Sequence, residues 1–197
     1  MILDRVIFGC NPLTSLKSYN LAIDLLNVVY DCGIRRYDTA PSYGNGYSEK
    51  IIGDFINEKR DTLITTKFGL GKDYNTKIPS SIALPLNYFK KKYFRKKLND
   101  ISSSRIFFND VKIDSRYIES SLKSSLKRLK SEKLECLLFH EGTPGKLTED
   151  AIELLLNYKK KKIINKIGFG TAYHTLSKIK NINSKVFDVA QYDLSLI

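Results

Sequence analysis

Apolar positions along the chain fall into two patterns, short continuous runs and stripes with helical spacing. Short runs bounded by turn residues are typical of buried strands, and stripes that repeat every three or four residues are typical of helices. The runs occupy residues 6–8, 35–39, 63–67, 134–140, 167–169 and 186–191. The stripes lie within residues 21–32, 51–56, 118–129, 148–158 and 176–179. Six strands alternating with five helices predict an α/β fold with a parallel sheet.

The first predicted helix carries the clearest stripe, with apolar side chains at offsets of 0, 4, 7, 8 and 11 residues. These are Leu21, Leu25, Val28, Val29 and Cys32. Gly33 follows, and a glycine at this place commonly ends a helix. Asp114 and Thr148 precede two later helices. We expect both to cap the amino ends of those helices, because Asp and Thr side chains accept hydrogen bonds from the first turn.

The chain has the length of one domain, which we expect to span residues 1–197. Residues 68–113 separate the third strand from the next helix and carry Pro79, Pro85 and a basic cluster at residues 90–97. Loops of this length are uncommon inside a compact domain and often act as lids. The sequence therefore predicts a long loop insertion that forms a flap over the sheet edge where the strands end.

The composition is strongly basic, with a formal net charge of +12 at pH 7. Only eight of the 33 basic residues are Arg, the residue favoured for bidentate phosphate recognition. The charge therefore indicates a Lys-rich solvated surface and not a nucleic-acid site. It also favours, weakly, a phosphorylated cofactor.

Several features indicate a cytoplasmic protein with no membrane partner. No apolar run approaches the length of about 18–20 residues that crosses a bilayer, and the amino terminus lacks the pattern of a secretory signal. Cys10, Cys32 and Cys136 fall in a predicted strand, helix and strand, without CxxC spacing. We expect all three to be buried thiols of a reducing compartment, not disulfide partners or zinc ligands.

Three successive predicted strands each deliver an ionisable side chain at or just past their carboxyl ends. Asp38 and Tyr43 follow the second strand. Lys67 ends the third strand and His140 ends the fourth. Active sites of parallel α/β folds form at this end of the strands, so we expect these side chains to meet.

The chemistry of such a group suits proton donation to a carbonyl. A tyrosine is a poor acid at neutral pH, but a neighbouring ammonium favours the phenolate. A carboxylate can hold the ammonium in place, and an imidazole can orient the carbonyl oxygen. Because no side chain supplies a hydride, a nicotinamide cofactor is implied.

Each residue also has an ordinary structural interpretation. Asp38 can cap a loop, and Tyr43 is one of 12 tyrosines, most of which serve packing. Lys67 can be one more surface lysine, and an isolated histidine such as His140 is usually structural. The shared position at the ends of consecutive strands is what favours chemistry.

The run from Asp38 to Glu49, followed by Gly53, resembles the signature of the aldo-keto reductases. Further segments similar to that family are residues 66–69, 121–129 and 138–140. The long segment after Lys67 is similar to the bacterial branch that includes sugar and pyridoxal dehydrogenases. Residues 9–13 and 191–196 resemble the first βα turn and the sixth strand of that branch.

The resemblance implies a (β/α)8 barrel of the TIM type, of which this sequence holds about six βα units. It implies NADPH or NADH as the cofactor, without a metal, and of the two we expect NADP(H) in preference to NAD(H). By motif, Tyr43 would be the general acid and base, Lys67 and Asp38 would tune it, and His140 would orient the carbonyl. The positions expected to contact the cofactor are Gly9, Cys10, Asp38, Gly170, Thr171 and Gln191.

The implied function is that of an oxidoreductase that interconverts a small carbonyl compound, sugar-like in kind, and its alcohol. Two departures weaken this expectation. Gly170-Thr171 stand where the family usually has Ser-Asn, and the sequence ends at Ile197, just past the sixth strand. The two βα units that bind the adenosine and phosphate half of the cofactor are therefore not among the predicted elements.

Two alternatives remain open. One is a truncated relative that keeps the four catalytic residues but binds cofactor poorly. The other is a non-catalytic interaction protein on the same fold. Unpaired sheet edges also offer a route to a homo-oligomer.

Overall fold

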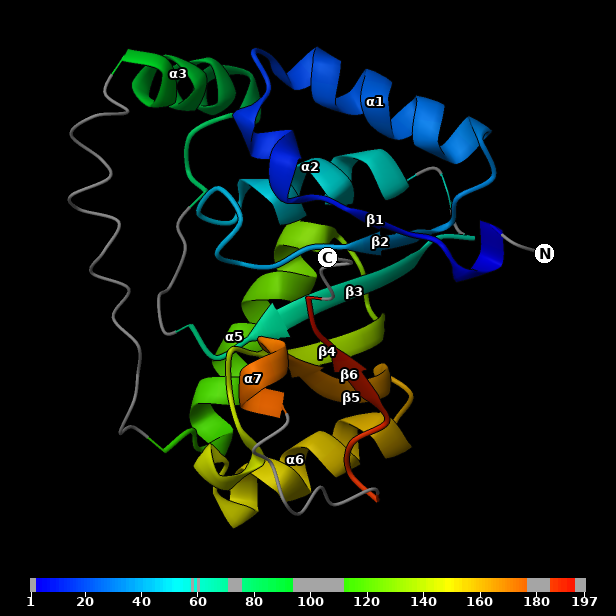
Figure 1. Cartoon of the computed structure of the whole chain (residues 1–197), viewed down its shortest axis with the longest axis vertical. Helices are drawn as coiled ribbons and strands as arrows, with labels where there is room; N and C mark the ends of the chain where they lie inside the picture. The colour runs from blue at the N-terminus through cyan, green and yellow to red at the C-terminus, as the bar shows by residue number, and fades with distance from the viewer. Residues whose placement is uncertain are drawn as a thin grey trace. The chain divides into compact units, whose positions relative to one another are not determined.

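A computed structural model describes residues 3–57, 59, 61–70, 76–93, 112–176 and 185–193. Strands and helices alternate as the sequence predicts, and the strands follow in the sheet the order that they have in the chain, from β1 to β6 (Figure 1). The chain forms two compact units. Unit 1 comprises residues 1–63, 74–107 and 128–130, and unit 2 comprises residues 64–73, 108–127 and 131–197.

Unit 1 is built on two parallel strands, with Gly9 opposite Asp38. Its elements are η1 (Leu3–Arg5), β1 (Ile7–Gly9), η2 (Asn11–Ser15), α1 (Tyr19–Asp31), β2 (Arg36–Asp38), α2 (Tyr47–Ile56) and α3 (Ser80–Tyr93). Helices α1 and α2 lie on the same side of the two strands (Figure 1). The fully buried ring of Tyr37 meets Phe55 of α2 edge-on, with 5.7 Å between the ring centroids. Such aromatic pairs stabilise a core beyond the burial of their area.

Helix α1 is present as its apolar stripe predicts, but it buries a neighbouring face. Its buried side chains are Ala22, Leu26 and Val29. Leu21 is 47% exposed and Val28 is 58% exposed, so most of the stripe does not enter the core of unit 1. The small side chain of Ala22 belongs to the buried face because it allows close packing, and a count of large apolar residues misses it.

The predicted loop insertion contains a helix, α3, that packs against α1, α2 and η2. Pro85 lies inside α3. Proline usually interrupts a helix interior, which is why the sequence favoured a loop here. Burial of Ala83 and Leu84 against the rest of unit 1 outweighs that preference. Residues 94–111, which include half of the basic cluster, lie outside the described residues, and the flap stays a prediction.

A buried ion pair fastens α2 to the last turn of α5 (Ser115–Leu129) within unit 1. Nε of Arg128 lies 2.6 Å from Oε2 of Glu49, whose side chain is fully buried. Gly53 allows the close approach: a Cβ there would stand 2.3 Å from the backbone oxygen of Arg128. The pair offsets the cost of burying the Glu49 carboxylate, because a buried charge without a partner is strongly destabilising.

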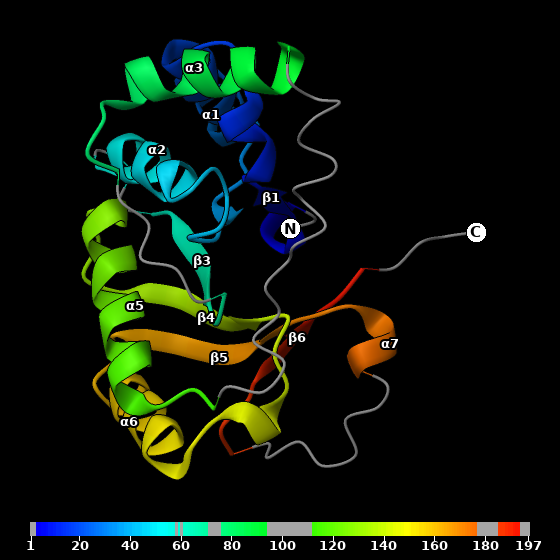
Figure 2. The same cartoon turned by 90° about the vertical axis from the view of Figure 1, so that its left-hand side faces the viewer.

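Unit 2 holds most of the parallel sheet, with Lys67 opposite Leu138 and His140 opposite Gly170. Its elements are β3 (Leu63–Phe68, of which Leu63 belongs to unit 1), α5 (of which Arg128 and Leu129 belong to unit 1), β4 (Leu134–His140), η3 (Pro144–Lys146), α6 (Glu149–Lys160), β5 (Ile164–Gly170), α7 (Tyr173–Leu176) and β6 (Val189–Gln191). Helices α5 and α6 lie on one side of β4 and β5 (Figure 2). Strand β4 is buried over most of its length, as expected for a parallel strand with both faces covered.

The two predicted helix caps have different outcomes. Oδ1 of Asp114 accepts a hydrogen bond from the backbone N–H of Tyr117 at 2.9 Å, so this cap is confirmed. Thr148 stands at the predicted place, directly before α6, but its side chain makes no capping hydrogen bond. Its hydroxyl donates instead to the backbone oxygen of Ile113 at 3.1 Å. The predicted N-cap position of Thr148 is confirmed, and only the expected side-chain hydrogen bond is missing, because this nearby carbonyl competes for the hydroxyl.

Hydrogen bonds join residues 113–115, at the start of α5, to residues 146–150, at the start of α6, and we call this contact the 113/148 junction. The backbone N–H of Ile113 donates to the oxygen of Lys146 at 2.8 Å, and the N–H of Thr148 donates to the oxygen of Ile113 at 3.1 Å. The N–H of Ser115 donates to Oδ2 of Asp150 at 2.9 Å. Hydrogen bonding to Ser115 holds the pKa of Asp150 well below its ordinary value.

The three cysteines do not share one environment. Cys10 and Cys136 are buried as expected, but Cys32 is exposed. The expectation of three buried thiols is therefore wrong for Cys32. It stands directly after α1, where it continues the exposed stripe of that helix.

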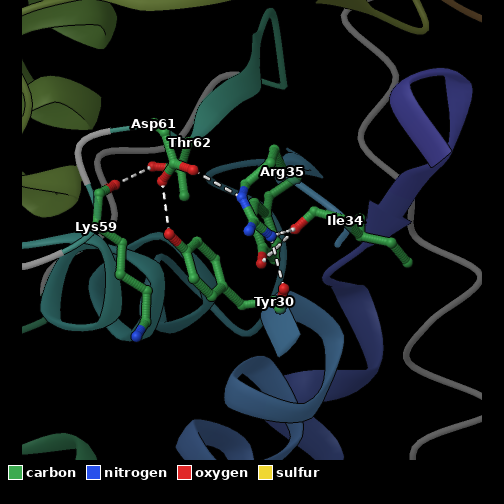
Figure 3. A network of polar contacts seen from close by, with 7 residues as sticks. Tyr30, Ile34, Arg35, Lys59, Asp61 and Thr62 are labelled. Carbon is green, nitrogen blue, oxygen red and sulfur yellow. Dashed lines mark hydrogen bonds and ion pairs between the residues drawn. The ribbon is translucent and has the colours of Figure 1, made fainter. Parts of the chain in front are cut away.

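Tyr30, Arg35, Lys59 and Asp61 form a group of polar contacts that we call the Tyr30 cluster (Figure 3). Arg35 directly precedes β2, and Asp61 lies just before β3. Asp61 accepts hydrogen bonds from the hydroxyl of Tyr30 at 2.8 Å and from Nε of Arg35 at 2.7 Å. The ring of Tyr30 also lies 3.7 Å from the guanidinium carbon of Arg35 and 4.6 Å from Nζ of Lys59. The hydrogen bond from Tyr30 lowers the pKa of Asp61, so this carboxylate stays ionised in the folded chain.

Candidate active site

Asp38 stands at the carboxyl end of β2 in unit 1, as the sequence predicts. It is 7% exposed, and its backbone oxygen accepts a hydrogen bond from the N–H of Cys10 at 2.8 Å. That bond aligns the ends of β1 and β2. Gly9, the last residue of β1, has open space where a Cβ would stand. The thiol of Cys10 is buried and lies 3.4 Å from the oxygen of Phe8, so Cys10 can offer a ligand only its backbone.

Tyr43 lies on the loop between β2 and α2 and is partly exposed. The loop turns sharply because Gly44, Asn45 and Gly46 all have positive φ, at 59°, 57° and 86°. A Cβ at Gly44 would also stand 2.4 Å from the side chain of Thr14. A left-handed backbone and a close neighbour together require glycine at this position.

Two buried hydroxyl groups, neither of which the sequence alone assigned a role, hold the base of this loop. The hydroxyl of Thr39 donates to Oγ of Ser48 at 2.9 Å, and Ser48 donates to the backbone oxygen of Cys10 at 3.0 Å. Both side chains are fully buried. They connect the ends of β1 and β2 to the start of α2, and so they fix both ends of the segment that carries Tyr43. The signal that could have identified them in the sequence is the presence of Thr39 and Ser48 in the motif that begins at Asp38.

Lys67 lies near the carboxyl end of β3 in unit 2 and is 3% exposed. A Cβ added to Gly170 would stand 3.4 Å from Cε of Lys67 and 3.3 Å from Oε1 of Gln191. The Lys67 side chain therefore extends across β4 to the end of β5. Lys67, Gly170 and Gln191 come together at one end of the sheet in unit 2.

His140 ends β4, next to Gly170 in the register. Burial, and then the positive charge of Lys67, lower the pKa of His140 to about 4. The imidazole is therefore neutral at neutral pH, with one ring nitrogen that donates and one that accepts. A neutral histidine beside a buried lysine can orient a carbonyl oxygen without itself giving up a full proton.

Thr171 follows β5 and is 8% exposed. Its backbone N–H donates to the oxygen of Gln191 at 3.0 Å, which extends the pairing of β5 and β6 by one residue. Thr171 and Gln191 thus place neutral hydrogen-bonding groups beside Gly170, where a Cβ would stand 3.3 Å from Oε1 of Gln191. The amide of Gln191 has both a donor and an acceptor, so it can pair with the amide of a ligand.

The predicted site residues thus fall into two groups. Asp38 and Tyr43 belong to unit 1, with Gly9 and Cys10. The second group belongs to unit 2 and consists of Lys67, His140, Gly170, Thr171 and Gln191. Each group stands at or just past the carboxyl ends of its own strands.

Neither a membrane-spanning helix nor a metal-binding cluster occurs in the described part of the chain. No helix there has the length and apolar character needed to cross a membrane. No three side chains of His, Cys, Asp or Glu among those residues gather in a way that could hold a metal ion.

Comparisons with known proteins agree on one family. The model of the Aldo/keto reductase family matches residues 5–196. An uncharacterized oxidoreductase of Bacillus subtilis is 26% identical over 170 residues, which cover 86% of this chain and 45% of that protein. A D-threo-aldose 1-dehydrogenase of a Pseudomonas species is 51% identical over 47 residues, which cover 23% of this chain and 14% of that protein.

Solved structures show the same fold. An aldo-keto reductase of Bacillus halodurans superposes with a TM-score of 0.65 at 18% identity, over 96% of this chain and 53% of that one. An aldo-keto reductase from Pseudomonas aeruginosa reaches 0.64 at 19% identity, over 96% and 62%. The predicted fold class, a barrel of the TIM type represented by six strands, is confirmed. The chain spans about half the length of the relatives that it matches.

Proposed function

Since the chain belongs to the aldo/keto reductase family, we propose that it interconverts a small carbonyl compound and its alcohol with a nicotinamide cofactor. The observation that carries the proposal is the arrangement in unit 2, where a buried lysine, a neutral histidine and the amide of Gln191 surround a glycine. Perturbed ionisable groups at the ends of parallel strands are a common mark of an active site. We propose NADP(H) as the cofactor in preference to NAD(H).

In this proposal Tyr43 carries the proton. Its hydroxyl donates to the carbonyl oxygen during reduction and takes the proton back during oxidation. The ammonium of Lys67 stabilises the phenolate that remains, and Asp38 holds that ammonium in place. When bound, the nicotinamide supplies or accepts the hydride.

His140 positions the substrate in the same proposal. A neutral imidazole donates one hydrogen bond to the carbonyl oxygen and so points it toward the Tyr43 hydroxyl. The low pKa of His140 suits this role, because a protonated histidine would compete with Tyr43 as the acid. Gly170, Thr171 and Gln191 would hold the carboxamide side of the nicotinamide ring, and Gly9 and the Cys10 backbone would line the open space at the end of β1.

The substrate class rests on local similarity. The relatives that are 51% and 46% identical over 47 and 46 residues are named for the oxidation of an aldose and of pyridoxal. Both are small polar compounds with an aldehyde or a corresponding alcohol. We propose a polar, sugar-like carbonyl compound as the substrate.

The test begins with binding and continues with turnover. NADPH and NADH are titrated against the 197-residue chain by fluorescence or calorimetry, and cofactor oxidation is then followed with small aldehydes. Tyr43→Phe should lower kcat by about 10²–10⁴-fold while the cofactor dissociation constant stays the same. The matched control Tyr30→Phe removes a hydroxyl from the Tyr30 cluster and should leave kcat unchanged. Full activity of Tyr43→Phe, or no binding of either nucleotide by the wild-type chain, contradicts the proposal.

A further inference from the structure

One face of helix α3 is apolar and exposed. Ile82, Leu86 and Phe89 are spaced by four and three residues, so they form one narrow stripe along the helix. They are 52%, 47% and 54% exposed, and Ile78, four residues before Ile82, is 50% exposed. We call these four side chains the α3 stripe. Neighbouring apolar side chains that stay open to solvent usually mark an interaction site.

The opposite face of α3 holds the helix on unit 1. Ala83 and Leu84 are buried, where α3 packs against α1, α2 and η2. At about 100° per residue, Leu84 lies roughly 160° around the helix from both Ile82 and Leu86. Helix α3 lies at the outside of unit 1, with α1 and α2 on one side of it (Figure 1, Figure 2). The α3 stripe therefore faces away from the core of unit 1.

The residues that lead into α3 are fastened to helix α2. The hydroxyl of Tyr47 donates to the backbone oxygen of Ile78 at 3.1 Å. Nζ of Lys50 donates to the backbone oxygens of Thr76 and Ile78 at 3.2 Å and 3.4 Å. The α3 stripe is thus presented by a helix whose start is held in place, so its side chains need no rearrangement to meet a partner as one surface.

The charge around the α3 stripe indicates an anionic partner. Residues 74–99 contain six Lys and one Arg, and neither Asp nor Glu. Lys77 and Lys92, near the two ends of the stripe, are both exposed. The prevalence of Lys distinguishes between kinds of partner, because protein–protein interfaces favour Arg and are depleted in Lys. Helices that lie in a membrane surface, in contrast, combine Lys on the polar side with Phe and Leu on the other.

We propose that α3 docks on an anionic lipid surface, with the α3 stripe at the boundary of the acyl chains and Lys77 and Lys92 at the phosphate headgroups. Lysine stems can lie along the apolar surface while the ammonium groups reach the headgroups. Apolar burial and charge attraction act together, which reversible membrane attachment usually requires. Such a helix lies in the surface and does not cross the bilayer, so it needs no run of membrane-spanning length. The inference is independent of the proposed reaction.

The experiment adds the 197-residue chain to vesicles of phosphatidylcholine, either alone or with about one third phosphatidylserine. The sequence has no tryptophan, so Phe89→Trp places a single indole in the α3 stripe. On the anionic vesicles its emission should shift to shorter wavelength, and brominated acyl chains should quench it. Binding measured by cosedimentation should be at least about tenfold weaker on the neutral vesicles, and it should fall as the salt concentration rises.

A first pair of variants tests the apolar part of the surface. Leu86→Ser with Phe89→Ser should weaken binding to the anionic vesicles by more than about tenfold, because two side chains lose apolar burial. Leu21→Ser with Val28→Ser on α1 is the matched control, since these side chains are exposed to a similar extent, at 47% and 58%. It should bind like the wild type. Circular dichroism establishes that both variants fold.

A second pair tests whether the position of the charge matters. Lys77→Gln with Lys92→Gln should weaken binding by roughly tenfold or more, because both ammonium groups are placed at the headgroups. Lys133→Gln with Lys161→Gln removes the same charge from two other exposed positions. This control should bind much more tightly than the α3 variant. Equal weakening would mean that net charge alone attracts the chain, which overturns the proposal.

Other outcomes also overturn the proposal. They are absence of binding to the anionic vesicles, unchanged indole emission on them, and binding of the Leu86→Ser and Phe89→Ser variant as tight as that of its α1 control. Equally tight binding to soluble polyglutamate would mean that an acidic protein is the occupant. A dimer of the chain that the same two substitutions dissociate would mean that a second copy covers the α3 stripe.

Discussion

Charged side chains are partly or well exposed in the Tyr30 cluster, whereas the lysine at the strand ends of unit 2 is buried. In the cluster, the ionised groups of Arg35 and Asp61 are partly or well exposed and directly paired at 2.7 Å. In unit 2, Lys67 is 3% exposed, and burial together with the charge of Lys67 lowers the pKa of His140. Both Asp61 and His140 have a lowered pKa, but the consequence differs with the type of group. The shift keeps the aspartate charged and keeps the histidine neutral.

The difference separates stability from function. The Tyr30 cluster needs no function to explain it, because exposed pairs and ring contacts of this kind give modest support to a fold. Burial, with the charge of Lys67 as the smaller cause, keeps His140 from ionising, and this lowers stability wherever the unfolded chain would bind a proton at that histidine. Perturbed ionisable groups at the ends of parallel strands are a common mark of an active site. Substitutions in the two regions should therefore affect different measurements.

The largest expected effect comes from Lys67→Met. Loss of the ammonium should lower kcat by about 10²–10⁴-fold, since the phenolate of the proposed mechanism loses its stabilising charge. It should also raise the pKa of His140 only part of the way to its ordinary value, because burial remains the larger cause. The chain has two histidines, so NMR titration of the ring protons follows His140 directly. Arg35→Met, which removes a cation from the Tyr30 cluster, should change neither quantity, and an unchanged His140 pKa in Lys67→Met would refute the assigned cause.

A second effect distinguishes two glycines of β5. A Cβ at Gly168 would stand 2.0 Å from the backbone oxygen of Val189, so Gly168→Ala must push β5 and β6 apart. We expect a loss of about 3 kcal/mol or more in the free energy of unfolding. Gly170→Ala meets only side-chain atoms, at 3.3 Å and 3.4 Å, and should unfold nearly like the wild type while NADPH binding weakens. Chemical denaturation and cofactor titration measure both, and equal loss of stability in the two variants would contradict this interpretation.

The pH dependence of stability is the third test. His140 has an ordinary pKa of 6.5 and a folded pKa of about 4. Between these values the unfolded chain binds more protons than the folded chain, so stability falls as the pH is lowered. The loss should reach about 3 kcal/mol at pH 4 relative to pH 7. Urea unfolding at several pH values measures it, and His140→Gln should remove most of the dependence between pH 4 and 6.5. The same slope in that variant would show that other groups cause it.

The smallest effect is expected from Asp61→Asn in the Tyr30 cluster. The pKa of Asp61 is lowered from 3.8, so its contribution to stability is present above that pH and is lost as the pH falls through the folded value. The midpoint of thermal unfolding at pH 7 should fall slightly, and the difference should shrink at high salt because the pair is exposed. Neither kcat nor cofactor binding should change. A fall in stability as large as that of Gly168→Ala would mean that the cluster supports the fold more than its exposure suggests.

The sequence predicted those parts of the molecule that local patterns determine. Strand β4 was predicted to the residue, from 134 to 140, because an apolar run and its flanking residues define it locally. Helix α1 was predicted, but not which face it buries, because that depends on the neighbours of Ala22. Helix α3 was missed because Pro85 argued against it and only packing within unit 1 overrules a proline.

The candidate site, too, was predicted from the sequence only where local patterns determine it. Sequence patterns placed Asp38, Lys67 and His140 at strand ends, because parallel strands share one direction. The approach of Lys67 to Gly170 depends on the pairing of β3, β4 and β5, which joins residues about a hundred positions apart in the chain. The low pKa of His140 depends on the same pairing. That the side chain of Tyr43 meets those of Lys67 and His140 in one site stays a prediction.

The 113/148 junction has a consequence for local unfolding. Ile113 precedes α5 and Ser115 begins it, whereas Thr148 precedes α6 and Asp150 lies in its first turn, yet hydrogen bonds join the two segments. Neither first turn can fray alone without breaking bonds to the other. Native-state hydrogen exchange should therefore assign the amides of Ser115 and Thr148 one shared opening free energy, so that two helices separated in sequence by β4 begin to unfold as one cooperative unit.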